Sequence, residues 1–86
     1  MPTRPSQNDP KRVAAWDRRR NRVGLRIQRA RHERGLTQEQ LALLSGVSRN
    51  VLMDVEHGRR GILLDRIFDI AKALGMSAAE LLDGVR

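Results

Sequence analysis

The sequence lacks cysteine and tyrosine, and its 86 residues include one tryptophan and one phenylalanine. Without cysteine, a disulfide scaffold, a thiolate zinc site and a cysteine nucleophile are all excluded. Proteins that recognise RNA usually stack unpaired bases on aromatic side chains, and only Trp16 and Phe68 are available here. RNA recognition is therefore disfavoured.

Long apolar runs and an export signal are also missing. No stretch approaches the ~20 apolar residues that a membrane span requires. Residues 1–5 contain no apolar segment of the signal-peptide type. Hydrophobic residues still make up 40% of the chain, which is enough for one small buried core. We therefore expect a single soluble, intracellular domain.

Catalytic and metal-binding patterns are absent as well. The sequence contains two histidines, His32 and His57. Neither has Asp, Glu or His neighbours at the spacing of metal ligands. No serine has a histidine in a triad context, and no glycine-rich phosphate loop follows a strand. We expect no enzyme activity, no cofactor and no metal.

Basic side chains are abundant and unevenly distributed. Seventeen lysines and arginines outnumber ten acidic residues, giving a net charge of +7, and all but two of the seventeen are arginines, which match phosphate oxygens. Residues 1–34 carry eleven basic and three acidic side chains, whereas residues 35–86 carry six and seven. The basic third is either a solvated, self-repelling tail or a nucleic-acid contact. Its nearly pure arginine content, continuing into a helical segment, favours nucleic acid.

From residue 23 onward the sequence predicts several short helices in succession. Apolar and polar residues do not alternate there as they would in a strand. Capping boxes at residues 37–40 and 77–80 open two helices, and Ser48 is a favourable N-cap for a third. Two further helices are indicated by apolar residues at helical spacing, each followed by a glycine. These residues are Val23, Ile27 and Ala30 before Gly35, and Leu64, Ile67, Ala71 and Leu74 before Gly75. The pattern predicts a compact all-α bundle of five helices.

Residues 1–22 form a basic extension that is harder to place. Asp9 and Pro10 suit the N-cap and first position of a helix, and one helix reaching residue 34 is geometrically allowed. Against it, Asn21 is a cap-type residue, and Gly24 weakens a helix interior by about 1 kcal/mol. We therefore expect an irregular start, a loosely formed helix near residues 10–19 and a break close to Asn21. The chain divides accordingly into an arm, 1–22, and a domain, 23–86.

The segment at about residues 37–56 indicates the function. Two short helices flank Gly46, which permits the positive φ of a sharp turn, and Val47 follows as an apolar plug. An ordinary helical hairpin also contains such a glycine. The spacing of Ala42, Gly46 and Val47 with Leu52 and Val55 instead favours a helix-turn-helix, whose second helix enters the DNA major groove.

These stretches resemble the phage repressor/Cro (Xre) type of helix-turn-helix DNA-binding domains, the lambda-repressor-like fold. The resemblance covers about residues 23–83. The matching segments are residues 26–31 (RIQRAR), 35–42 (GLTQEQLA), 45–49 (SGVSR), 55–60 (VEHGRR) and 70–75 (IAKALG).

The resemblance implies a role for each matched position. Base-reading positions at the start of the recognition helix and one turn further on are Ser48, Arg49, Asn50 and Asp54. Gln38 braces the recognition helix and a DNA phosphate, and Arg59 and Arg60 lie in the loop that grips backbone phosphates. A structural ion pair joins Arg31 to Glu56.

The chemistry of the base-reading positions agrees with these roles. Arg49 can bind guanine O6 and N7, and Asn50 can pair with adenine N6 and N7, each discriminating by about 1–3 kcal/mol. A phosphate contact or a solvated side chain is an equally good interpretation of Arg49, because most protein–DNA hydrogen bonds go to the backbone. Asp54 departs from the family pattern. It either accepts a hydrogen bond from cytosine N4 or restrains Asn50 one turn earlier, and near a phosphate it would otherwise be repelled.

A second departure lies before the fourth helix. Where the family usually has Asn-Pro-Ser-Leu, residues 61–64 read Gly-Ile-Leu-Leu, and Phe68 lies beside the apolar face that follows. Ile62, Leu63 and Phe68 either thicken the core or form a self-association patch, and we favour self-association.

The resulting prediction is a small transcriptional regulator, a repressor in the first instance, that binds double-stranded DNA in the cytoplasm at the nucleoid. It predicts a homodimer on a palindromic operator with half-sites ~34 Å apart. The alternative is the antitoxin of a toxin–antitoxin pair or a restriction–modification controller, with a toxin or other protein bound by the arm.

The arm's arginines either reach DNA phosphates or the minor groove, or the arm docks on the domain or a second subunit. They are Arg18, Arg19, Arg20 and Arg22.

Overall fold

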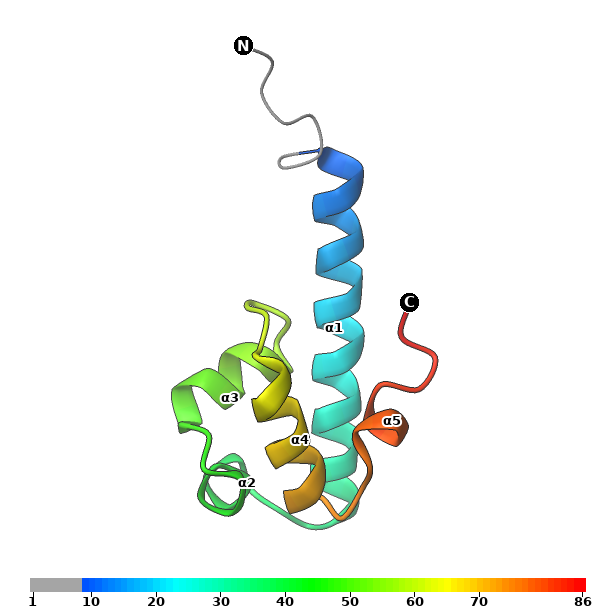
Figure 1. The fold of residues 1–86 in the computed structure, drawn as a ribbon. Helices are drawn as coiled ribbons and strands as arrows, with labels where there is room; N and C mark the ends of the chain where they lie inside the picture. The colour runs from blue at the N-terminus through cyan, green and yellow to red at the C-terminus, as the bar shows by residue number, and fades with distance from the viewer. Residues whose placement is uncertain (1–8) are drawn as a thin grey trace.

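The computed structural model describes residues 9–86, and within this range it contains five helices and no strand (Figure 1). The helices are α1 (Pro10–Glu33), α2 (Gln38–Ser45), α3 (Arg49–Glu56), α4 (Leu64–Ala73) and α5 (Ala78–Leu81). The predicted all-α, five-helix architecture is confirmed. None of the described helices is long and apolar enough to cross a membrane.

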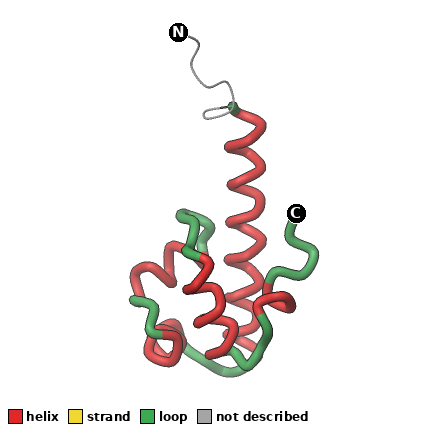
Figure 2. Tube along the Cα trace, in the orientation of Figure 1, coloured by secondary structure: helices red, strands yellow, loops and turns green. Residues whose placement is uncertain are grey.

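One small core holds the helices together. Helices α2 to α5 gather around the C-terminal half of α1, whereas the N-terminal half of α1 projects beyond them (Figures 1 and 2). Every helix contributes at least one side chain that is fully buried. These side chains are Ile27, Leu41, Leu52, Ile70, Leu74 and Leu81. At about 25 cal/mol per Å² of buried apolar area, they supply the main drive for folding.

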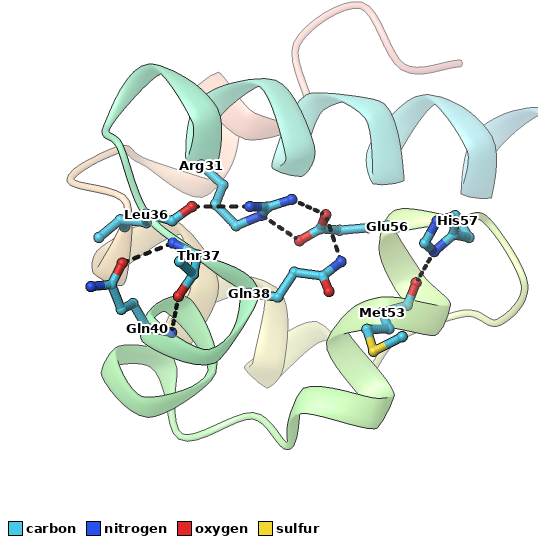
Figure 3. Close-up of polar contacts among 8 residues, drawn as sticks. All are labelled: Arg31, Leu36, Thr37, Gln38, Gln40, Met53, Glu56 and His57. Atoms are coloured by element: carbon cyan, nitrogen blue, oxygen red, sulfur yellow. Dashed lines mark hydrogen bonds and ion pairs between the residues drawn. The ribbon is translucent and has the colours of Figure 1, made fainter.

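The helix starts follow the local signals in the sequence. Thr37 accepts a hydrogen bond from the amide of Gln40 at 3.1 Å, and the Gln40 side chain accepts from the amide of Thr37 at 2.8 Å (Figure 3). Ser77 and Glu80 form the same reciprocal pair at the start of α5. Two orphan amides are thereby satisfied at each helix start, so short helices begin at defined residues.

Helix α1 is continuous, and the break expected close to Asn21 is wrong. Asp9 caps the helix by accepting from the amide of Lys11 at 2.9 Å, and 24 residues follow without interruption. The Asn21 side chain donates to the carbonyl of Asp17 at 2.9 Å, one turn back, instead of capping a new helix. Residues 1–8, with the expected irregular start, lie outside the described range.

Gly24 allows two helices to approach closely. A Cβ atom at this position would lie 2.4 Å from the carbonyl oxygen of Val55 and 2.6 Å from that of Glu56. The end of α3 therefore packs directly on the backbone of α1, which only a residue without a side chain permits. The packing gained across this contact offsets the low helix propensity of glycine.

Candidate nucleic-acid interface

The turn between α2 and α3 is fixed by its backbone and by small polar contacts. Gly46 ends α2 with a φ of 73°, in the left-handed region. Val47 follows and is only 5% exposed, and its amide donates to the hydroxyl of Ser45 at 3.3 Å. With Leu41 and Leu52 fully buried on either side, the two helices have one relative orientation. This is the helix-turn-helix expected for residues 37–56.

Helix α3 is buried at its C-terminal end and exposed at its first turn. Ser48 caps it by accepting from the amide of Val51 at 3.3 Å. Leu52 and Val55 are 0% and 2% exposed, so the helix is held firmly by one face. Ser48, Arg49 and Asn50 are all exposed. The structure thus places these three predicted base-reading side chains together, outside the core, on a rigid helix end.

A buried ion pair ties α3 to α1. Arg31 Nε and Nη2 each donate to the Glu56 carboxylate at 2.9 Å, and Nη1 donates to the carbonyl of Leu36 at 2.9 Å (Figure 3). The side chains of Arg31 and Glu56 are 8% and 1% exposed. A bidentate, desolvated pair of this kind fixes the orientation of both groups, and removing one partner typically costs ~3–5 kcal/mol.

Gln38 joins this buried network through Glu56, a partner that the sequence did not name. Its Nε2 atom donates to Glu56 Oε1 at 3.3 Å (Figure 3). The first residue of α2 is thereby linked to the last residue of α3. Gln38 and Arg49 also line one open groove of about 750 Å³ between the ends of α1, α2 and α3. The hydrogen bond to Glu56 links Gln38 to α3, as a brace of the recognition helix would require, whereas its role toward a DNA phosphate stays a prediction.

Arg49 has a neighbour on α2 that sequence reasoning missed. Its Nη1 atom lies 3.8 Å from the carboxylate of Glu39, and the two side chains are 55% and 71% exposed. An exposed pair at this distance contributes about 0–1 kcal/mol. Arg49 can therefore leave Glu39 for a stronger acceptor at little cost.

The loop after α3 is held against the middle of α1. His57 ends the helix, and its Nδ1 atom lies 2.7 Å from the carbonyl oxygen of Met53 (Figure 3). Gly58 follows with a φ of 71°. A Cβ atom at Gly58 would lie 2.3 Å from Asn21 Oδ1, so the loop backbone rests on the side chain of Asn21. This contact positions the two arginines that come next in the chain.

Asp54 lies one turn after Asn50 in α3, and its carboxylate is also close to those two arginines. Its carboxylate oxygens are 3.9 Å from Arg59 Nη1 and 3.6 Å from Arg60 Nε. The amide of Arg59 also donates to the Asp54 backbone carbonyl at 2.8 Å. The structure thus brings one predicted base-reading residue together with two predicted phosphate-binding residues.

The four arm arginines differ in their surroundings. Arg20 pairs with Asp17 at 2.8 Å, and Arg22 donates to the carbonyl of Gly84 at 3.1 Å. Arg18 and Arg19 are exposed, and neither side chain has a hydrogen bond or an ion pair among the described residues, 9–86. All four belong to α1, so the arm is helical from residue 10 onward.

An apolar patch is exposed where α4 begins. Leu63, Leu64 and Phe68 are 74%, 67% and 55% exposed, whereas Ile62 is half-buried and packs against the core. Leu63 occupies the N-cap position of α4 and makes no side-chain hydrogen bond there, in line with the missing serine. Of the three residues in the predicted patch, Leu63 and Phe68 are exposed, and Ile62 belongs to the edge of the core.

Comparisons with known proteins agree with this geometry. A family model described as helix-turn-helix matches residues 27–81. An uncharacterized HTH-type transcriptional regulator, y4dJ, from Sinorhizobium fredii is 42% identical over 72% of this chain and 80% of its own. Control protein C.BamHI from Bacillus amyloliquefaciens is 42% identical over 56% and 59% of the two chains. The immunity repressor of Bacillus phage phi105 is 41% identical over 69% and 41%.

Solved structures give the same result. The restriction–modification controller protein C.AhdI from Aeromonas hydrophila superposes with a TM-score of 0.71 at 39% identity, covering 72% of this chain and 94% of that one. The clp gene regulator ClgR from Corynebacterium glutamicum superposes with a TM-score of 0.72 at 31% identity, covering 74% and 68%. The chain therefore belongs to the helix-turn-helix family of DNA-binding proteins, of the phage repressor/Cro (Xre) type.

Proposed function

We propose that this DNA-binding transcriptional regulator acts as a repressor that reads its operator with the first turn of α3. The observation that carries the proposal is the exposure of Ser48, Arg49 and Asn50 on a helix whose other face is locked into the core. A helix end presented in this way fits the major groove, where base edges carry a distinct donor and acceptor pattern. Arg49 suits guanine and Asn50 suits adenine.

Phosphate contacts position the reading helix. Gln38 lies at the N-terminus of α2, where backbone amides already favour an anion. Arg59 and Arg60 occupy the loop at the other end of α3, and their side chains are 66% and 50% exposed. Contacts on both sides of α3 would hold it in register along the groove while carrying no sequence information themselves.

The regulator would bind as a homodimer on a palindromic operator. The exposed Leu63 and Phe68 would form the contact between the two copies around the start of α4. Residues 35–86 carry six basic and seven acidic side chains, so two such bodies meet without strong charge repulsion. Two copies of α3 would then enter successive major grooves on one side of the duplex, ~34 Å apart. Binding of this kind would hold the protein at the nucleoid.

The arm would add sequence-independent affinity. Arg18 and Arg19 are the arm arginines that remain available for flanking phosphates. Six basic residues against one acidic residue between positions 10 and 22 make this half of α1 strongly cationic. Such a segment strengthens binding to every duplex through counterion release.

The test of the reading helix is selection of bound sequences from a random duplex pool. The wild-type protein should enrich one motif, and Arg49→Ala and Asn50→Ala should each flatten the preference at one or two base pairs. Arg66→Ala is the matched control, because it removes an exposed arginine of α4 that pairs with Asp69. An unchanged motif in both α3 variants would refute the proposal.

A restriction–modification controller is the second candidate, and two similar proteins are named as controllers. A repressor and a controller share the same DNA-reading geometry, so the site does not separate them. The neighbouring genes do, because a controller should lie beside an endonuclease and a methyltransferase. An antitoxin would instead lie beside a toxin gene, with the toxin bound through residues 1–22.

A further inference from the structure

We propose that Asp54 does not read a base but acts as a charge brake on the phosphate-binding loop, lowering the affinity for all duplexes alike. The inference rests on the proposed role of Arg59 and Arg60. It assigns to Asp54 a positioning and electrostatic function: its carboxylate competes with DNA phosphates for the two loop guanidinium groups. Base contacts then decide which duplexes remain bound.

The geometry places the carboxylate where phosphates would bind. Asp54 lies in the last turn of α3, and both of its oxygens face loop arginines, at 3.9 Å and 3.6 Å. The Asp54 backbone carbonyl accepts from the amide of Arg59 at 2.8 Å, and Gly58 rests on Asn21, so the loop cannot drift away from the carboxylate. The other acidic residue of this region, Glu56, is buried and neutralised by Arg31.

The two ion pairs are loose enough to open. Both distances exceed a hydrogen bond, and the side chains of Asp54, Arg59 and Arg60 are 37%, 66% and 50% exposed. Exposed pairs of this kind contribute little to stability. The arginines can therefore turn toward a phosphate, which accepts from a guanidinium at ~2.8 Å in a stronger contact.

The negative charge of Asp54 stays behind when the arginines turn. It is attached to a helix that is held in the core by the buried side chains of Leu52, Val55 and Glu56. A phosphate bound to either arginine then lies within the ~8 Å over which charges interact at physiological ionic strength. The resulting repulsion opposes backbone binding on any sequence. A protein of net charge +7 would otherwise bind DNA nonspecifically with high affinity.

The alternative interpretation, hydrogen bonding of Asp54 to cytosine N4, predicts the opposite result. If Asp54 reads a base, neutralising its carboxylate should lower the affinity of the protein for the operator. The base preference should also change at one position. A charge brake gains affinity for every duplex and leaves the preference unchanged. The same substitution therefore separates the two roles by the sign of its effect.

The experiment compares Asp54→Asn with the wild-type protein on the selected operator and on an unrelated duplex. We expect the dissociation constants of both duplexes to fall by about three- to tenfold at low salt, since neighbouring charges in water interact by about 1 kcal/mol. The salt slope should become steeper by about one, and the selected motif should not change. In an Arg59→Gln/Arg60→Gln background, Asp54→Asn should have no effect.

Asp69→Asn is the matched control, because it also removes a carboxylate paired with an exposed arginine, Arg66, at 3.4 Å on α4. It changes the net charge equally and should leave DNA affinity nearly unchanged. Weaker operator binding by Asp54→Asn, a shifted motif, or the same gain in the double-arginine background would each overturn the inference. If the wild-type protein selects no motif, the proposed reading helix fails instead, whereas the measurement on the unrelated duplex still tests Asp54.

Discussion

Single residues decide how the reading helix is held. Glu56 accepts two bonds from Arg31 and one from Gln38, so α1, α2 and α3 meet at one buried carboxylate (Figure 3). Arg31→Ala would leave this carboxylate buried without its counter-charge. The loss of ~3–5 kcal/mol should lower the melting temperature by at least about 12 °C. Arg29→Ala removes an exposed arginine from the same helix and should change it little. Equal melting temperatures would contradict the structural role of the pair.

Gly24 offers a second test at the residue scale. Alanine is the better helix former by about 1 kcal/mol, yet its methyl group would meet the carbonyl oxygens of Val55 and Glu56. We expect Gly24→Ala to lower the melting temperature by about 4–24 °C, because overpacking at a fixed backbone contact costs ~1–3 kcal/mol. Gly61→Ala is the control, since its Cβ would meet nothing within 4 Å. A more stable Gly24→Ala protein would show that the helices can separate without loss.

At the scale of elements, local signals predicted the helices well. The capping boxes at Thr37 and Ser77 and the cap at Ser48 depend on residues within one turn, so the sequence alone locates these helix starts. The sequence did not predict that α1 is continuous. Gly24 serves as a contact point for the carbonyl groups of Val55 and Glu56, which lie far along the chain in α3. The position of Asp54 beside the loop arginines was missed for the same reason: it depends on how the chain turns at Gly58.

The projecting half of α1 carries a spectroscopic reporter. Trp16 is 37% exposed, and the Arg12 guanidinium lies 5.1 Å from its ring centroid. We expect red-shifted emission from the free protein and a blue shift when duplex is added, because a bound DNA backbone would shield the ring from water. The emission of Trp16 reports on this segment alone, as it is the single tryptophan.

The affinity that this half-helix adds can be measured separately. Arg18→Gln/Arg19→Gln should weaken binding to every duplex equally and reduce the salt slope by up to about two, with no change of motif. Arg29→Gln is the control for net charge on the same helix. Undiminished affinity of the double variant at moderate salt would assign the arm to a partner other than DNA.

At the scale of the whole molecule, the proposed homodimer depends on the patch at the start of α4. Leu63→Glu/Phe68→Glu places two charges on exposed positions and leaves the core intact, so the monomer should remain folded. Sedimentation equilibrium should show a dimer for the wild-type protein and a monomer for the variant. Leu44→Glu, at a position 62% exposed on α2, should remain dimeric. A wild-type protein that stays monomeric even on its operator would rule out the paired half-sites.

The half-packed state of α1 has a consequence for hydrogen exchange. Backbone amides from Gly24 to the end of the helix lie beside the core, and they open only when the domain unfolds. Amides in the first three turns are protected by helical hydrogen bonds alone, and short helical segments without packing are marginal in water. Exchange rates along this one helix should therefore fall steeply between residues 13 and 27, and bound duplex should slow exchange at the outer end only.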